Sequence, residues 1–244
     1  MAVLIIIPAR MKATRLPNKP MADISGVPMI VQVWRRAMES GVGDVVVACD
    51  GIEIEQAVVA AGGMAVITDP DHPSGSDRIW EALSVRESGH ARYDIIINLQ
   101  GDVPTLEPRL LQELLAPLTN PEVDIATLAA VIEREEEHDN PSVVKAVLAL
   151  KDKQKSGRAL YFTRCGAPYG EGVRYHHIGV YAYRREALAR FVALPPSPLE
   201  LREKLEQLRA LEAGMRIDAV VVDTVPLGVD TPEDLARARE LLCD

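Results

Sequence analysis

The chain has 244 residues, of which 48% are hydrophobic and 26% charged, and it carries a formal net charge of −9. This length fits one large domain or a domain with a smaller lobe, and the composition is that of a globular protein. The acidic balance argues against a wide nucleic-acid surface, because such a surface needs a basic face to displace counterions from the phosphates.

The cysteines and the N-terminal residues indicate the cellular compartment. Cys49, Cys165 and Cys243 show neither CxxC nor zinc-type spacing, so we expect them to be reduced thiols. The apolar run 2–7 lacks a basic region before it and is too short for a signal peptide or a membrane span. We therefore expect a cytoplasmic protein without membrane insertion.

The first half of the chain alternates predicted strands with predicted helices. The strands are expected at 3–7, 45–48, 64–68 and 94–99. The helices are expected at 28–40, 52–61 and about 76–86. Pro8 is expected to end the first strand, and Ser76 or Asp77 to cap the third helix. Because each crossover must pack its helix back onto the sheet, this alternation predicts a mostly parallel sheet, whose ligands bind beyond the carboxyl ends of the strands.

The second half is richer in strands. They are expected at 125–132, 143–150, 159–164, 176–183 and 217–222. Helices are expected at 108–118, from Ser197 to about Ala213, and after a cap at Thr231. Few helices separate these strands, which indicates a smaller mixed or antiparallel lobe. We divide the chain into a first lobe of about 1–130, a second of about 131–225, and a return to the first lobe at 226–244.

A cluster of positive charge follows the first predicted strand. Residues 4–20, LIIIPARMKATRLPNKP, contain Arg10, Lys12, Arg15 and Lys19 but no glycine. The chain has neither the GxxxxGK[ST] of a P-loop nor the GxGxxG of a dinucleotide site, so charge must replace a glycine cradle. We expect Arg10, Arg15 and Lys19 to neutralise a triphosphate and the charge on leaving pyrophosphate. The structural alternative is a solvated basic loop.

Two carboxylates have no evident structural task. Asp102 directly follows a buried strand, and Asp230 precedes Thr231, which already caps the last helix. Two carboxylates near a polyphosphate indicate a magnesium site, since this ion takes oxygen ligands from protein and phosphate together. For Asp102, an ordinary turn residue is the alternative.

Seven motifs together carry a family resemblance. They are PARMKATRLPNKP, GSDR at 75–78, NLQGD at 98–102, YFTR at 161–164, HHIGVY at 176–181, LEQLR at 205–209 and GVDTPED at 228–234. With them the chain resembles the 3-deoxy-manno-octulosonate (Kdo) cytidylyltransferases, or CMP-Kdo synthetases, over nearly its whole length. The resemblance implies an α/β fold with a Rossmann-like, GT-A type, mostly parallel nucleotidyltransferase sheet and a smaller mixed or antiparallel dimerisation lobe. It also implies a homodimeric enzyme that uses CTP and Mg²⁺ to activate Kdo for lipopolysaccharide synthesis, releasing pyrophosphate.

The resemblance further implies roles for single residues. The catalytic residues would be Arg10, Lys19, Asp102 and Asp230, and the two aspartates would hold Mg²⁺. The CTP-binding residues would be Arg10, Arg15, Lys19, Ser74, Gly75, Arg78 and Gln100. The sugar-binding residues would be Gln100, Arg164, His177, Glu206 and Gln207. Arg164 suits the Kdo carboxylate, although pattern alone would make Arg164 and His177 structural groups and leave Glu206 solvated.

Three places depart from the family pattern, and three alternatives stay open. The departures are Ala13 in place of a serine, Val103 where an acidic residue is common, and the stretch 165–169. The nearest alternative is the same chemistry on 8-amino-Kdo or a sialic acid. A GT-A glycosyltransferase would share the sheet and metal but usually has a DxD motif, where this chain has Gln100, Gly101 and Asp102. A catalytically silent nucleotide-binding protein is the third alternative.

Overall fold

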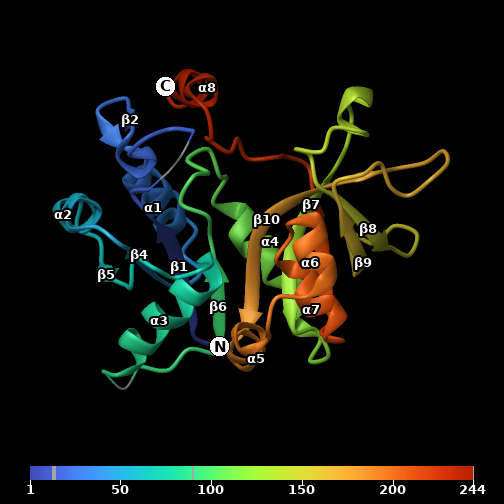
Figure 1. The fold of residues 1–244 in the computed structure, drawn as a ribbon, viewed down its shortest axis with the longest axis horizontal. Helices are drawn as coiled ribbons and strands as arrows, with labels where there is room; N and C mark the ends of the chain where they lie inside the picture. The colour runs from blue at the N-terminus through green and yellow to red at the C-terminus, as the bar shows by residue number, and fades with distance from the viewer. Residues whose placement is uncertain (13–14, 90, 244) are drawn as a thin grey trace. The chain divides into compact units, whose positions relative to one another are not determined.

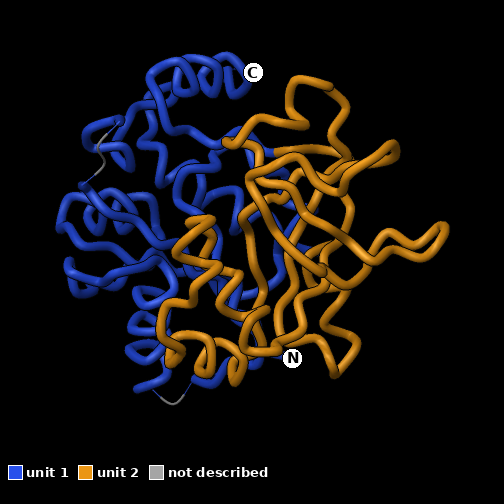
Figure 2. The backbone as a smooth tube through the Cα atoms, turned by 45° about the vertical axis from the view of Figure 1, so that its right-hand side comes forward, with its two compact units in different colours: residues 1–112, 226–244 blue, residues 113–225 orange. Residues whose placement is uncertain are grey.

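The structure is a computed structural model that describes residues 1–12, 15–89 and 91–243. The chain divides into two compact units, which Figure 2 shows in two colours. Unit 1 comprises Met1–Gln112 and Pro226–Asp244, and unit 2 comprises Glu113–Val225. The C-terminal segment therefore belongs to the same unit as the first strand. Among the described residues, no helix is long and apolar enough to cross a membrane.

Unit 1 contains parallel strands in the order β5-β4-β1-β6. Their bounds are β1 (Val3–Ala9), β4 (Asp44–Cys49), β5 (Ala65–Ile67) and β6 (Ile95–Asn98). Residues 4–7 are completely buried, as β-branched and apolar residues are in a strand that is covered on both faces. These four strands lie where the apolar runs predict them.

Three helices connect these strands, and Figure 1 shows them around β1 and β4. They are α1 (Met29–Glu39), α2 (Ile52–Ala60) and α3 (Gly75–Glu87). The crossovers of α1 and α2 step in one direction across the strands, and that of α3 returns. Because such crossovers are right-handed, α1 and α2 cover one face and α3 the other.

The residue that caps α3 differs from the predicted one. Ser74, rather than Ser76 or Asp77, caps this helix, and its Oγ accepts a hydrogen bond from Asp77 N at 3.2 Å. Ser74 Oγ also donates to Asp77 Oδ2 at 2.7 Å. Asp77 lies three residues after the cap, which is where the acidic partner of a capping residue belongs. The helix consequently begins next to the 69–74 loop.

Pro8 does not end β1, contrary to the prediction. The strand continues to Ala9 and pairs with β4 throughout, whereas its pairing with β6 stops at Ile6. The backbone N–H and C=O groups of residues 6 and 8 face the same edge of β1, because the direction of these groups alternates from one residue to the next along a strand. Because the pairing with β6 has already ended at Ile6, no described strand on that edge has a carbonyl that would accept the N–H which proline lacks. A Cβ on Gly101 would lie 2.8 Å from Pro8 O, so glycine lets the loop after β6 pass close to the end of β1.

A short hairpin and the C-terminal helix complete unit 1. The hairpin of β2 (Asp23–Ile24) and β3 (Val27–Pro28) turns at Ser25 and Gly26, whose φ angles are 53° and 81°. These strands are too short to produce a periodic pattern, and the sequence did not predict them. Figure 1 shows α8 (Pro232–Leu241) beside β2, and Arg239 Nε donates to Asp23 O at 2.9 Å. The predicted start of α8 is confirmed.

Unit 2 contains strands in the order β10-β7-β11-β9-β8, and β8 also pairs with β10. Their bounds are β7 (Ile125–Val131), β8 (Lys145–Ala149), β9 (Ser156–Thr163), β10 (Tyr175–Arg184) and β11 (Ile217–Val222). The pairing of β11 with β7 is parallel, and the other pairings are antiparallel. This strand arrangement is therefore mixed.

The helices of the second half differ from the prediction at several places. The predicted helix 108–118 is α4 (Arg109–Leu114) followed by a 3-10 helix (Ala116–Thr119), because Pro117 cannot continue an α-helix. The sequence did not predict α5 (Arg185–Ala193). The acidic residues Glu135–Glu137 form a short 3-10 helix.

The predicted helix from Ser197 to about Ala213 is two helices. They are α6 (Pro198–Glu203) and α7 (Gln207–Glu212). Lys204 separates them with a φ of 55°, a left-handed conformation that a side chain makes uncommon and that ends a helix. The break gives Glu206 and Gln207 a new orientation relative to α6.

Candidate active site

A cavity of about 820 Å³ lies in unit 1, at the loops that follow β1, β5 and β6. It occupies the carboxyl ends of the parallel strands, where open α/β sheets bind ligands. The structure brings to this cavity every residue predicted to be catalytic or to bind CTP, namely Arg10, Arg15, Lys19, Ser74, Gly75, Arg78, Gln100, Asp102 and Asp230. Ala13, one of the departures from the family pattern, is outside the described residues.

Lys19 joins the two aspartates predicted to hold a metal. Lys19 Nζ donates to Asp102 Oδ2 at 2.6 Å and to Asp230 Oδ1 at 2.9 Å. Arg15 Nη2 donates to Asp230 Oδ2 at 2.9 Å. Burial by itself would lower the pKa of Lys19, but the charges and hydrogen bonds of the two carboxylates outweigh burial and raise it. The two carboxylates thus converge on one cationic atom.

These carboxylates suit Mg²⁺ when a polyphosphate completes its coordination. The described residues contain no group of three or more His, Cys, Asp or Glu side chains that could hold a metal alone. Asp102 and Asp230 both form ion pairs with the ammonium group of Lys19. Magnesium prefers oxygen ligands, and it commonly takes one or two carboxylates together with substrate phosphates and water. The donor set therefore fits this ion.

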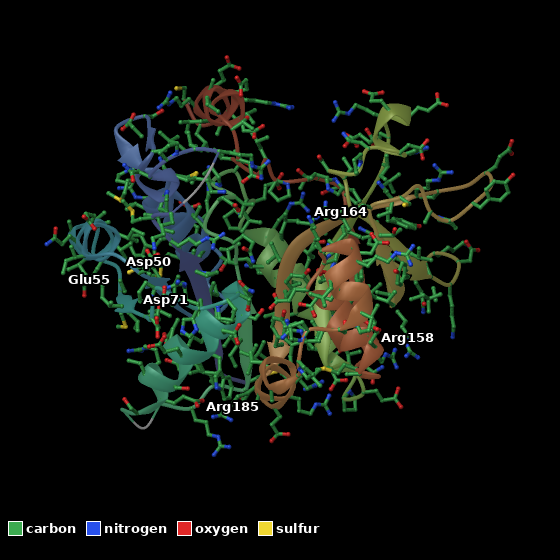
Figure 3. The ribbon with its side chains drawn as sticks, in the orientation of Figure 1. Asp50, Glu55, Asp71, Arg158, Arg164 and Arg185 are labelled. Atoms are coloured by element: carbon green, nitrogen blue, oxygen red, sulfur yellow. The ribbon has the colours of Figure 1, made fainter. Side chains whose placement is uncertain are left out.

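Backbone hydrogen bonds hold the loops that carry this cluster. Val229 N donates to Asp102 O at 2.8 Å, which ties the loop after β6 to the segment before α8. Asp230 N donates to Asp234 Oδ2 at 3.1 Å, so the start of α8 fixes the backbone of Asp230. Met11 N donates to Asp50 Oδ1 at 3.0 Å, which anchors the basic loop to the end of β4. Asp50 is labelled in Figure 3.

Arg78 places an uncompensated positive charge at the wall of the cavity. Its side chain is buried, and its Nη1 donates to Thr68 Oγ1 at 2.5 Å. Within the part of the chain that the structure describes, no carboxylate forms an ion pair with Arg78. A buried cation without a carboxylate partner favours an anionic ligand, because burial of an isolated charge is costly.

Two other polar groups near the cavity have structural partners. Ser74 Oγ forms the capping hydrogen bonds of α3, and Gln100 Nε2 donates to Asn98 Oδ1 at 3.2 Å.

Cys49, at the end of β4, is buried, and burial raises the pKa of its thiol to about 11. The thiol is therefore protonated at neutral pH and does not supply a nucleophile.

Three of the residues predicted to bind the sugar lie close together in unit 2. Arg164, labelled in Figure 3, follows β9, and its Nε donates to Glu203 O at 2.8 Å. Its Nη1 donates to Pro141 O at 2.9 Å. The first bond ties Arg164 to the end of α6, shortly before Glu206 and Gln207, and the second ties it to the segment before β8. Its guanidinium is oriented by backbone carbonyls rather than by carboxylates.

Glu206 and Gln207 are more buried than helical phase predicts. Glu206 is half-buried and Gln207 is buried, so the expectation of a solvated Glu206 is wrong. The physical reason is the break at Lys204, which makes Glu206 the residue before α7 instead of a residue inside one long helix. Gln207 Nε2 is buried and has no hydrogen-bond partner among the described residues. Such a buried amide favours a ligand with an acceptor group.

His177 is a buried residue of β10 with a structural partner. Its Nε2 lies 3.0 Å from Thr127 Oγ1, and its ring packs on Phe162 with the ring centroids 4.7 Å apart. Burial, with a smaller contribution from His176, lowers the pKa of His177 to about 3. The imidazole is therefore neutral at physiological pH.

The parallel strands with a basic cavity at their carboxyl ends are typical of α/β proteins that bind phosphorylated ligands, and comparison with known proteins narrows this class. The cytidylyltransferase family model matches residues 4–217. A 3-deoxy-manno-octulosonate cytidylyltransferase from Paramagnetospirillum magneticum is 62% identical over 239 residues, 98% of this chain and 97% of the relative. The protein of the same name from Parvibaculum lavamentivorans is 65% identical over 240 residues, 98% of this chain and 92% of the relative.

A solved structure supports the same assignment. The CMP:2-keto-3-deoxy-manno-octonic acid synthetase complexed with CTP aligns with a TM-score of 0.90 at 41% identity, covering 100% of this chain and 99% of that chain. The chain belongs to the 3-deoxy-manno-octulosonate cytidylyltransferase family.

Proposed function

We propose that this protein transfers the cytidylyl group of CTP to Kdo and releases pyrophosphate. The observation that carries the proposal is the convergence of Asp102, Asp230 and the basic loop in one cavity. Its support is the family membership, together with a similar structure that is complexed with CTP. The sequence has no glycine-rich loop whose backbone N–H groups could bind phosphates. The positive charges of Arg10, Arg15 and Lys19 can bind a triphosphate instead.

The chemistry is an in-line displacement at the α-phosphorus. The anomeric hydroxyl of the sugar forms a bond to that phosphorus, and the bond from phosphorus to the bridging oxygen of pyrophosphate breaks. Asp102 and Asp230 would hold Mg²⁺, which when bound would supply positive charge against the phosphates and acidify the attacking hydroxyl. Arg10, Arg15 and Lys19 bind the phosphates and stabilise the charge that develops on the leaving group.

We assign CTP recognition and sugar recognition to two sets of residues that share Gln100. Ser74, Gly75, Arg78 and Gln100 contribute to CTP binding, and the buried charge of Arg78 supports this role. Gln100, Arg164, His177, Glu206 and Gln207 recognise the sugar. The buried amide of Gln207 supports a polar ligand there. Among the described residues, the guanidinium of Arg164 donates to backbone carbonyls and to no carboxylate, so it suits the acid group of Kdo.

We also propose the cellular setting and the assembly. The protein would act in the cytoplasm as a homodimer, with a GT-A type nucleotide-binding lobe and a dimerisation lobe, and supply CMP-Kdo for lipopolysaccharide synthesis. The free thiols Cys49, Cys165 and Cys243 support a reducing compartment. Light scattering after size exclusion would measure the mass of the assembly.

An assay of sugar selectivity tests the proposed function. Purified protein is incubated with CTP and Mg²⁺ and with Kdo, 8-amino-Kdo or N-acetylneuraminate, separately and in competition, and pyrophosphate is measured. We expect the highest kcat/KM with Kdo. A preference for either of the other sugars would replace Kdo as the substrate. Normal CTP binding without pyrophosphate release from any sugar would instead indicate a silent nucleotide-binding protein.

A further inference from the structure

The loop before α3 is held by a residue that does not line the cavity. Glu81 Oε2 accepts a hydrogen bond from Asp69 N at 2.9 Å, and the same oxygen lies 2.5 Å from His72 Nε2. His72 and Ser74 line the cavity, whereas Glu81 lies behind them on α3. One carboxylate oxygen therefore fixes both the start of the loop and its histidine.

The acceptor oxygen of Glu81 determines which nitrogen of His72 carries the proton. Burial by itself would raise the pKa of Glu81, but the hydrogen bonds from Asp69 N and His72 outweigh it and lower the pKa. An ionised carboxylate only accepts hydrogen bonds, so His72 Nε2 must donate. In the neutral imidazole, Nδ1 then carries the free electron pair. No described residue forms a hydrogen bond with Nδ1, and the side chain is 20% exposed at the cavity.

We propose that His72 is a further nucleotide-binding residue of this cavity and that Glu81 is its positioning residue. Nδ1 of His72 accepts a hydrogen bond from an amino or hydroxyl group of the nucleoside, and Glu81 holds the ring and the loop in place for it. The proposal rests on the proposed function in that the nucleotide is CTP. An acceptor nitrogen favours the nucleoside over the phosphates, because amino and hydroxyl groups can donate to it and ionised phosphate oxygens cannot.

Binding measurements with two ligands distinguish a nucleoside contact from a phosphate contact. Calorimetry with CTP and with tripolyphosphate is performed at pH 8, above the ordinary titration range of imidazole. We expect His72→Phe to weaken CTP binding about 5- to 10-fold, the effect of one hydrogen bond of about 1 kcal/mol, and to leave tripolyphosphate binding within about 2-fold. Equal losses for both ligands would overturn the nucleoside contact.

Substitutions of Glu81 test the positioning role. Glu81→Ala should weaken CTP binding as much as His72→Phe, and the double variant should add little, because both changes remove one interaction. Glu81→Gln should restore affinity to within about 3-fold of wild type, since its amide oxygen can accept both hydrogen bonds of the original oxygen. If Glu81→Gln binds CTP as weakly as Glu81→Ala, Glu81 does not act by positioning.

Asp71→Asn is the matched control. Asp71 lies in the same loop, is exposed and is labelled in Figure 3, and within the described residues its carboxylate forms no hydrogen bond or ion pair with Glu81 or His72. This substitution removes the same charge as Glu81→Gln and should leave CTP affinity unchanged. Melting temperatures of all variants identify any general loss of folding. A wild type that binds CTP without turnover contradicts the proposed function only, whereas a wild type that binds no CTP contradicts both proposals.

Discussion

At the residue scale, the central feature is that two carboxylates share one ammonium group. Asp102 Oδ2 and Asp230 Oδ1 lie 2.6 Å and 2.9 Å from Lys19 Nζ. In the proposed reaction, a triphosphate with Mg²⁺ would bring both new anions and a new cation to this cluster. The carboxylates would then bind the metal while the ammonium group of Lys19 would bind the phosphates.

The metal assignment predicts a large loss of turnover on neutralising either carboxylate. Asp102→Asn and Asp230→Asn keep the shape of the side chain but weaken its binding of Mg²⁺. We expect each to lower kcat by at least about 100-fold, the scale of losing one electrostatic element of a transition state. Steady-state kinetics at saturating CTP and Mg²⁺ provide the measurement. Near-normal rates in both variants would remove the metal assignment.

Asp50 provides a prediction about the basic loop. Its carboxylate accepts the backbone N–H of Met11, so Asp50→Ala frees the loop that carries Arg10. We expect Asp50→Ala to raise KM for CTP about 5-fold or more, as for the loss of one hydrogen bond to a charged group. Asp50→Asn retains an acceptor oxygen and should bind CTP nearly as the wild type does. Similar KM values for wild type and Asp50→Ala would show that the anchor does not matter.

His177 gives the stability of the protein a defined pH dependence. Its pKa is about 3 in the folded chain, mainly because of burial, and about 6.5 in an unfolded chain. As the pH falls below about 6.5, the unfolded state binds a proton that the folded state does not, so stability is lost on acidification towards pH 3. Between pH 7.5 and 5.5 this site should cost about 1.4 kcal/mol.

Urea unfolding of wild type and His177→Gln at both pH values isolates this contribution. Glutamine can keep a hydrogen bond to Thr127 but does not titrate. We expect the variant to lose less stability than the wild type on acidification. An identical loss in both proteins would mean that His177 is not the titrating group.

The sequence could predict which residues line the candidate active site, but it could not predict several of the contacts that these residues make. The charges of Arg15 and Lys19 and the position of Asp102 after a strand indicated the cavity. The oxygen of Glu81 that joins His72 to Asp69 N could not be predicted, because a helix residue and a loop residue meet there only after folding. The cap at Ser74 was recognisable from its spacing to Asp77, a signal that the prediction from Ser76 or Asp77 missed.

At the element scale, helix starts that are marked by side chains were predictable and helix breaks were not. Thr231, Pro232 and Asp234 specify the start of α8 through a capping box and a proline at its beginning. The break between α6 and α7 has no such mark, since Lys204 rather than glycine adopts the left-handed conformation there. Pairing of β8 with β10 is set by tertiary packing and leaves no local pattern.

The cap of α8 couples helix stability to the site. Thr231→Ala removes the side-chain oxygen that caps α8, which should cost about 1 kcal/mol of unfolding free energy. Because the same capping box fixes the backbone of Asp230, turnover should fall as well. Ser197→Ala is the control, since Ser197 caps α6 of unit 2 with the same type of box and does not line the cavity. Equal effects of both variants on kcat would contradict the coupling.

At the scale of the whole molecule, charge is distributed so that an acidic protein binds an acidic ligand. The chain carries a net charge of −9, yet Arg10, Arg15, Lys19 and Arg78 meet at one cavity. The membership of residues 226–244 in unit 1 brings Asp230 to that cavity. What pattern alone did not provide is the substrate, which depends on the family resemblance and the comparisons.

The most direct test follows the phosphorus atoms of CTP by phosphorus NMR in the presence of Kdo and Mg²⁺. We predict that the triphosphate signals are replaced by equal amounts of a phosphodiester, CMP-Kdo, and pyrophosphate. The double variant Asp102→Asn, Asp230→Asn should leave CTP intact. Phosphodiester formation by that variant at the wild-type rate, or an unchanged CTP spectrum with the wild type, would contradict a cytidylyl transfer at this cavity.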